Sequence, residues 1–173
     1  MSVISRLNKS TLSATQKRQV KKALASKSTI KYVTADDTVA NASVAHVPID
    51  NLSIPVEKNK VYKFEVWTHF TNAGGAGGAQ ISFTGSATAN WINGQWFADS
   101  SVAAAATTSV AIAAITDESQ AAEGVAAVVW IRGTGVYSPS DDGVFKVAGA
   151  QSTSNASDTI CKKGSWFSLE EIV

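Results

Sequence analysis

Two histidines and one cysteine are the residues of this sequence that could support acid–base or nucleophilic catalysis. A Ser-His-acid triad would have to use His46 or His69, and the sequence contains no Gly-x-Ser-x-Gly nucleophile elbow. His69 falls inside a segment with strand periodicity, which favours a sheet-surface histidine, and His46 is expected in a loop or at an edge. Cys161 precedes Lys162 and Lys163, whose charges could lower its pKa, but no second motif supports a nucleophile. We therefore expect a buried or incidental thiol and a protein that is not an enzyme.

Metal and nucleotide sites have equally little support. Two histidines and one cysteine are too few ligands for a Cys/His zinc site. Asp141 and Asp142 are adjacent in a turn, which does not supply the spaced oxygens of a calcium loop. The glycine-rich stretch 71–79 is followed by Gln80, without the Lys and Ser or Thr of a P-loop. We expect no cofactor and no metal.

An aromatic cluster of Trp91, Trp96 and Phe97 surrounds Asn93-Gly94, a pair of the kind that closes a β-hairpin. Packing in the core or at a subunit interface is the first interpretation, because such rings bury large areas. The alternative is an exposed loop whose rings stack on a glycan. The sequence leaves both interpretations open.

The elements that must carry these residues are β-strands. From Val61 to Phe70, the apolar residues Tyr62, Phe64 and Val66 recur every second position, which is typical of a half-buried strand. This segment is expected to be the central strand of a sheet. Further strands are expected in 29–34, 43–49, 80–85, 101–115, 124–133, 144–147 and 164–173.

Two of these segments indicate their place in the sheet. Pro48 and Pro55 each lack a ladder donor, so strands near them are expected to be short and at an edge. Residues 124–133 form a nearly continuous apolar run, which is consistent with a strand covered on both faces. About eight short strands separated by turns predict an all-β fold, an antiparallel β-sandwich of jelly-roll type.

Charge divides the chain into a basic arm and an acidic body. Residues 1–31 carry eight bases and no acid, whereas residues 32–173 carry seven bases and all fourteen acids, a net charge of −7. Ser13 and Gln16 fit a capping box, so the arm is expected to contain one short helix. We place the arm at 1–28 and one β-sandwich body at 29–173. Such an arm is suited to an oppositely charged surface or to nucleic acid.

Several partner classes are disfavoured. The arm has no aromatic residue to stack on bases and the body is acidic, which argues against nucleic acid. No apolar run is long enough to span a bilayer, so membrane insertion is not expected. The first residues lack the apolar core of a secretory signal, so no export is expected.

Five features follow one another over residues 38–173: Ile54-Pro55-Val56, the polar turn 57–60, the strand 61–71, the glycine-rich loop and the closing segment 163–172. This order resembles the small β-sandwich modules of tailed-bacteriophage virion proteins, which occur in capsid decoration proteins, head fibres and tail-fibre tips. The resemblance implies a homotrimer that an N-terminal segment attaches to the particle. The short arm and the lack of a long shaft favour decoration of the head.

We therefore expect a non-enzymatic, homotrimeric capsid decoration (cement) or head-fibre protein on the outer capsid surface of a virion. Its arm would dock on the major capsid protein through basic and apolar side chains. The residues expected to dock are Ile4, Arg6, Leu7, Lys9, Leu12, Lys17, Arg18, Val20, Lys21, Lys22 and Leu24. The alternative is a tail-fibre tip that binds a host surface glycan through Trp91, Trp96 and Phe97.

Overall fold

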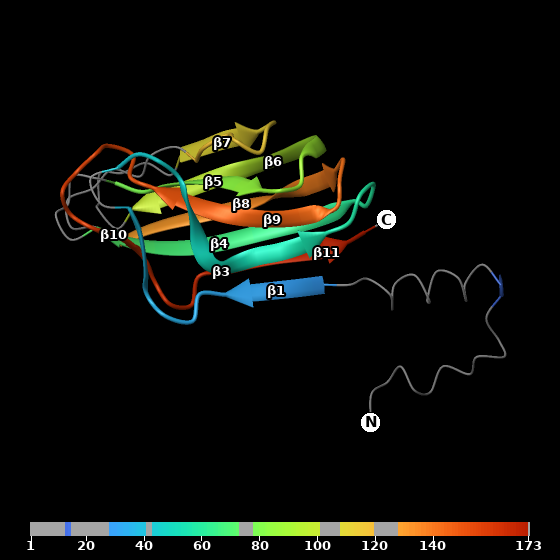
Figure 1. Ribbon diagram of the computed structural model, residues 1–173, viewed down its shortest axis with the longest axis horizontal. Coiled ribbons are helices and arrows are strands. Elements are labelled where there is room, and N and C mark those ends of the chain that lie inside the picture. The colour runs from blue at the N-terminus through green and yellow to red at the C-terminus, as the bar shows by residue number, and fades with distance from the viewer. Residues whose placement is uncertain are drawn as a thin grey trace, which may run out of the picture.

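The computed structural model describes residues 13–14, 28–40, 43–72, 78–100, 108–119 and 128–172. In these ranges the strands pair antiparallel and form two sheets packed face to face (Figure 1). The predicted all-β sandwich is confirmed. Nearly all of the predicted helical segment, and every residue expected to dock on a capsid, lies outside the described ranges. No helix within them is long and apolar enough to cross a membrane.

The larger sheet contains eight strands, six of which follow one another side by side. Their order is β1 (Ser28–Tyr32), β11 (Trp166–Glu171), β4 (Tyr62–Asn72), β8 (Val128–Pro139), β6 (Ala89–Ser100) and β7 (Thr108–Ile112). The short β10 (Thr159–Cys161) pairs with the end of β4, and β2 (Asp37–Ala40) pairs with β10. β11 and β10 therefore run one after the other beside β4.

The smaller sheet contains β3 (Val47–Val56), β9 (Gly143–Ala150) and β5 (Gln80–Gly85) in that order, and it lies in front of the larger sheet in Figure 1. β3 is an edge strand, as its prolines predicted. The expectation of short strands near Pro48 and Pro55 is wrong for β3, which has ten residues and contains both prolines. A register shift between Pro48 and Ser53 lets β3 continue along β9, and an edge strand needs ladder donors on one side alone.

Aromatic rings fill the space between the two sheets. Phe64 on β4 meets Phe83 on β5 edge to face, with ring centroids 5.0 Å apart. Tyr137 on β8 stacks on Phe145 of β9 at a centroid distance of 4.1 Å. Trp96 on β6 is fully buried, and its ring lies 4.8 Å from that of Phe83. Each pair joins one sheet to the other, so these rings fix how the sheets pack.

The central strand is confirmed by β4, in which buried and more exposed residues alternate and whose neighbours are β11 and β8. The strands expected in 80–85 and in the closing segment are also present, as β5 and β11. β8 extends past the predicted segment, to Pro139, and it is not covered on both faces. Its Trp130 and Arg132 side chains are exposed, because the smaller sheet covers one face of the larger sheet only.

The hairpin expected at Asn93-Gly94 is wrong, because both residues lie in the middle of the continuous strand β6. Gly94 is needed there for packing and not for a turn. A Cβ atom added to it would lie 2.8 Å from Cζ of the Phe64 ring and 2.5 Å from the Thr134 carbonyl oxygen. The glycine therefore makes room for a core ring beneath the sheet.

Candidate functional site

The outer face of the larger sheet, the side turned away from the smaller sheet, carries Trp91 near one end of β6 and three further tryptophans. Trp67 lies between two buried residues of β4, and Trp130 lies between two buried residues of β8. Trp166 precedes the buried Phe167 on β11. Because side chains alternate along a strand, all three rings point away from the core. Trp67 is 37% exposed and Trp130 38%, which is high for such large apolar side chains.

The register of the strands places five outward side chains in one line across the sheet. Tyr32 lies opposite Trp166, Trp166 opposite Trp67, Trp67 opposite Arg132, and Arg132 opposite Phe97. Directly opposite residues of an antiparallel pair project from the same face. We call these five residues the aromatic row. With strands about 4.8 Å apart, it crosses roughly 19 Å of the face.

Trp130 begins a second line beside the aromatic row. His69 and Asp99 lie opposite it on the two neighbouring strands. The imidazole of His69 stacks on Trp130 with centroids 4.0 Å apart, and the Trp67 and Trp130 rings are 5.8 Å apart. Within the row, Cζ of Arg132 lies 5.0 Å from the centre of the Phe97 ring. These contacts hold the rings in place, which lowers the conformational entropy lost when a partner binds.

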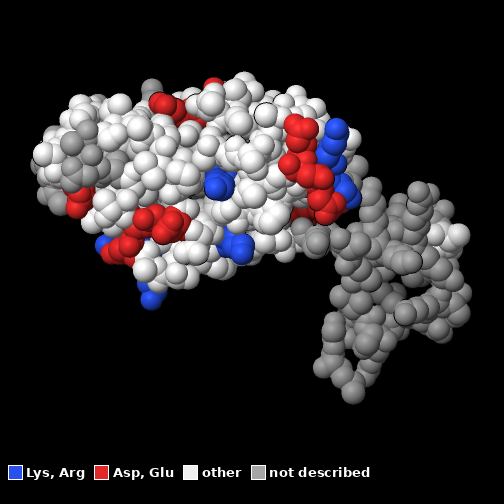
Figure 2. Space-filling view, viewed as in Figure 1, with Lys and Arg blue, Asp and Glu red and all other residues white. Residues whose placement is uncertain are grey.

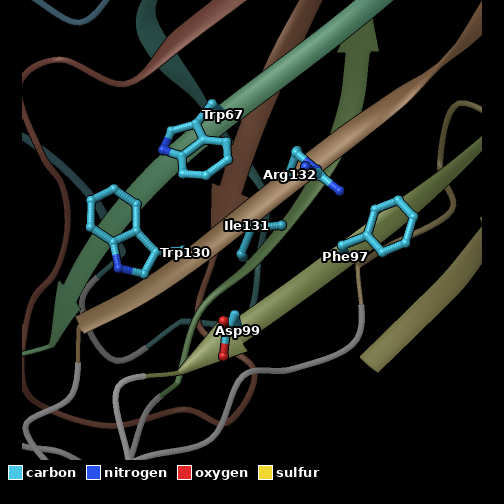
Figure 3. A pocket seen from close by; sticks show the side chains of 6 residues that line it. All are labelled: Trp67, Phe97, Asp99, Trp130, Ile131 and Arg132. Atoms are coloured by element: carbon cyan, nitrogen blue, oxygen red, sulfur yellow. The ribbon is translucent and has the colours of Figure 1, made fainter. Parts of the chain in front are cut away.

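Two shallow hollows lie on either side of Trp67 and Arg132. One has a volume of about 310 Å³, and Figure 3 shows Arg132 reaching across it toward Phe97. It is lined by Trp67, Phe97, Asp99, Trp130, Ile131 and Arg132. The other, of about 360 Å³, extends toward Trp166 and Glu65. Rings combined with one guanidinium and one carboxylate can bind an apolar surface and also pair with charge of either sign.

The predicted ligand loop is not brought together as one platform. Trp96 is fully buried, and its Nε1 donates a hydrogen bond to the carbonyl oxygen of Asp117 at 3.1 Å. Phe97 follows it on β6 and therefore points to the opposite face, where it joins the aromatic row. Trp91 is 44% exposed but lies near the other end of β6, opposite Ser138. Of these three residues, Phe97 alone belongs to the site.

Sequence reasoning missed Tyr32, Trp67, Trp130, Arg132 and Trp166 as parts of one surface. A signal was present for the tryptophans. Each of them stands out of phase with the buried residues of its own strand, so it falls on the side of the two-residue period where polar residues are expected. The strand order that brings them into one line could not be deduced from alternation.

The residues considered for catalysis do not form a reactive group in the described part of the chain. The Cys161 thiol is buried and donates a hydrogen bond to Oγ of Ser165 at 3.4 Å. Burial raises its pKa to about 12, which keeps the thiol protonated at neutral pH. Desolvation, reinforced by the Lys162 charge, lowers the pKa of His69. Its Nε2 is buried and has no hydrogen-bond partner among the described residues.

His46 lies in the loop before β3, as expected. Its Nδ1 is 3.4 Å from Oε1 of Glu118. Burial lowers the pKa of His46, and the nearby carboxylate of Glu118 partly opposes that effect. Like that of His69, its Nε2 is buried without a hydrogen-bond partner in the described ranges.

The paired aspartates hold a turn together. Asp141 accepts hydrogen bonds from the hydroxyl groups of Thr88 and Ser140, at 2.7 and 2.9 Å. Asp142 accepts one from the backbone N–H of Lys58 at 2.6 Å. No group of three or more metal-ligating side chains occurs among the described residues. Residues 73–77 of the glycine-rich stretch lie outside them.

Comparisons with known proteins leave the family open. No protein-family model and no curated protein matches the chain. Among solved structures, Eiger TNF from S. frugiperda is similar at a TM-score of 0.39 and 9% identity, over 86% of this chain and 93% of that one. The VP2 subviral particle of infectious bursal disease virus gives a TM-score of 0.21 and 9% identity, over 86% and 42%. The Gx strain of that virus gives 0.19 and 12%, over 84% and 42%. These TM-scores are too low to carry a functional argument.

Proposed function

We propose that this chain is a non-enzymatic structural protein of a virion. In this proposal it is a homotrimeric capsid decoration or head-fibre protein, held on the outer capsid surface by its basic N-terminal arm. The observation that carries the proposal is the aromatic row. A sheet face with exposed tryptophans, a tyrosine, a phenylalanine and a central arginine has the composition of the anchor residues in protein–protein interfaces. Such a face supports a role in assembly.

The charge separation supports the arm as an anchor. The body has a net charge of −7 over residues 32–173, and Figure 2 shows acidic side chains in several groups on one face. An acidic body and an acidic capsid surface would repel one another, and a basic segment between them removes that repulsion. β1 begins at Ser28, opposite Glu170, so the arm joins the body at one end of the sheet edge (Figure 1).

Charge alone is too weak to hold the arm on a particle. An exposed ion pair contributes about 0 to 1 kcal/mol, and salt screens it. Docking must also bury apolar arm residues such as Leu7, Leu12 and Leu24. The proposal therefore requires an apolar contact surrounded by basic side chains.

The test is co-sedimentation of the purified full chain with capsids of its source virus. Replacing Lys17, Arg18, Lys21 and Lys22 with glutamine should abolish binding, and added salt should weaken binding of the unmodified chain. The matched control removes four body charges, by glutamine at Lys58, Lys60, Lys146 and Lys163. Binding that survives the arm substitutions, or that the control loses equally, would contradict the anchor role.

A second candidate function is binding of a host surface glycan, as expected of a tail-fibre tip. The hollow of about 310 Å³ favours it, because rings beside a carboxylate and a guanidinium can stack on a sugar and hydrogen-bond its hydroxyl groups. A glycan array probed with the full chain and with Trp130→Ala would test this role. Trp91→Ala is the matched control, since Trp91 is as exposed as Trp130 but lies away from the hollow.

A further inference from the structure

We infer that the outer face of the larger sheet is where copies of this chain pack against each other. The rings on β1, β11 and β4 of one copy would lie over β6 and β7 of the next. This inference rests on the proposed function in that it names the surface of the proposed homotrimer. It also assigns a partner, a second copy of this chain, to residues that the sequence did not single out.

The first argument is the size of the exposed face. Six strands about 4.8 Å apart span roughly 24 Å, and strands of 5 to 12 residues are about 17 to 40 Å long. A flat face of these dimensions has an area on the order of 600 Å², and the side chains that project from it add to the accessible surface. In a ring of copies two neighbours share this face, so it is the whole face, and not each contact, that approaches the roughly 800 Å² a partner contributes to a stable protein interface. A small sugar would cover the hollow and leave most of the rings exposed.

The second argument is the pattern of β8. Its apolar run is typical of a strand covered on both faces, yet in the single chain Trp130 remains 38% exposed on the outer side. Trp67, Tyr32 and Ile30 are exposed on the same face. A protein surface laid over this face would complete the burial that the sequence of β8 indicates.

The third argument is that the outward side chains differ in size between the two halves of the face, one formed by β1, β11 and β4 and the other by β6 and β7. On β1, β11 and β4 the outward positions hold bulky rings, namely Tyr32, Trp166 and Trp67. On β7 the outward positions hold Ser109 and Ala111, both small and exposed, although the neighbouring β6 still carries Phe97 on this face. A bulky half fits a flat half better than it fits a second bulky half. In the homotrimer proposed above this contact is heterologous, and a rotation that closes it gives a ring of three copies.

The fourth argument is that the face carries charges of both signs. Arg132 and Asp99 lie on neighbouring strands, and neither forms an ion pair with another described residue. Lys63 and Glu65 also lie on this face and pair with each other at 2.7 Å. A copy that docks here therefore does not meet a surface of one sign, which would repel an identical partner.

The test is the mass of the full chain by light scattering, at one fixed concentration. The unmodified chain should have three times the 18.0 kDa chain mass. Trp67→Glu places a carboxylate among the rings, and Ser109→Arg places a large cation on the flat half. Both should reduce the mass to that of one chain. Val47→Glu is the matched control, because Val47 is an exposed strand residue of the smaller sheet and should keep the assembly.

Circular dichroism melting of each variant separates loss of assembly from loss of folding. If the unmodified chain is a monomer, or if folded Trp67→Glu and Ser109→Arg keep the full mass, the inference is overturned. A monomer whose glycan-array binding is lost in Trp67→Glu would assign the face to a saccharide instead. An assembly that both variants break but that ignores capsids would support this interface and contradict the decoration role. The two proposals therefore fail separately.

Discussion

Trp96 and Phe97 are adjacent on β6 and lie on opposite sides of the larger sheet. The Trp96 ring is fully buried beneath the sheet, next to Phe83, and its N–H group is hydrogen-bonded. The Phe97 ring is half-buried on the outer face, where Arg132 lies over it. Alternation along one strand thus assigns the first ring to the core and the second to the outer face, which we propose contacts a partner.

This difference predicts two unequal substitutions. Trp96→Ala leaves a large cavity in the core and should lower the free energy of unfolding by about 3 to 5 kcal/mol. Phe97→Ala removes a partly exposed ring and one cation–π contact, so it should cost about 1 kcal/mol or less within a single chain. Urea unfolding of both variants below the concentration at which copies associate measures the two values. Equal losses would contradict the assignment of the rings to opposite faces.

The Cys161 thiol should be nearly inert in the folded protein. It is buried and hydrogen-bonded to Ser165, and its pKa of about 12 leaves almost no thiolate at pH 8. A thiol-specific reagent should therefore react at least about a hundredfold more slowly with the native chain than with the unfolded chain, whose thiol has an ordinary pKa. Cys161→Ser provides the blank. Similar rates in the native and unfolded states would show that the thiol is accessible.

At the scale of elements, a glycine on β8 leaves the space that a core ring of the paired strand β6 occupies. Gly133 lies opposite Trp96, whose ring folds across it. A Cβ atom at this position would come within 2.1 Å of Cζ3 and 2.4 Å of Cε3 of the indole. Since two strands fix the backbone on either side, the clash must displace a core ring.

Gly133→Ala should therefore destabilise the fold by about 1 to 3 kcal/mol, the usual range for overpacking a core. The effect should be smaller in a Trp96→Leu background, because the smaller side chain leaves room for the added methyl group. Chemical unfolding of the two single variants and the double variant measures the coupling. Thr134→Ala serves as a control on the adjacent, outward position of β8. Additive effects at Gly133 and Trp96 would show that the ring does not set the limit.

The sequence predicted those elements whose alternation is long and regular. β4 and β11 follow from a two-residue period, because a strand with one buried face needs apolar residues at every second position. β2 and β10 have four and three residues, too few for any period to show. The turn predicted at Asn93-Gly94 was wrong because the sequence does not distinguish a glycine that makes room for a ring from a glycine that forms a turn.

Of the residues in the candidate site, the sequence singled out one, Phe97. The rest depends on which strands are neighbours. Tyr32 and Phe97 stand 65 residues apart in the sequence, and they share a line across the sheet only because β11, β4 and β8 lie between β1 and β6. Long-range pairing of this kind is set by the packing of the whole core, so local propensity does not reveal it.

For the molecule as a whole, we expect the two histidines to determine how stability changes near neutral pH. The pKa values of His46 and His69 are both lowered, chiefly by burial. The unfolded chain, with histidine pKa values near 6.5, therefore binds protons more readily than the folded chain as the pH falls. Stability should be fully present above about pH 6.5 and decline as the pH falls from there toward the lowered pKa values. The pKa values of Asp36 and Asp141 are lowered too, but these carboxylates begin to titrate only below this window.

Each histidine can contribute a slope of at most about 1.4 kcal/mol per pH unit, and partial exposure reduces the share of His69. Urea midpoints at pH 7.5, 6.5 and 5.5, at constant protein concentration, should fall with pH in the unmodified chain. His69→Phe keeps a ring to stack on Trp130 but removes the titrating group, and His46→Gln removes the other. Each variant should flatten the profile, and both together should flatten it most. A profile that is already flat in the unmodified chain, or one that stays steep in the double variant, would place the proton-sensitive groups elsewhere in the molecule.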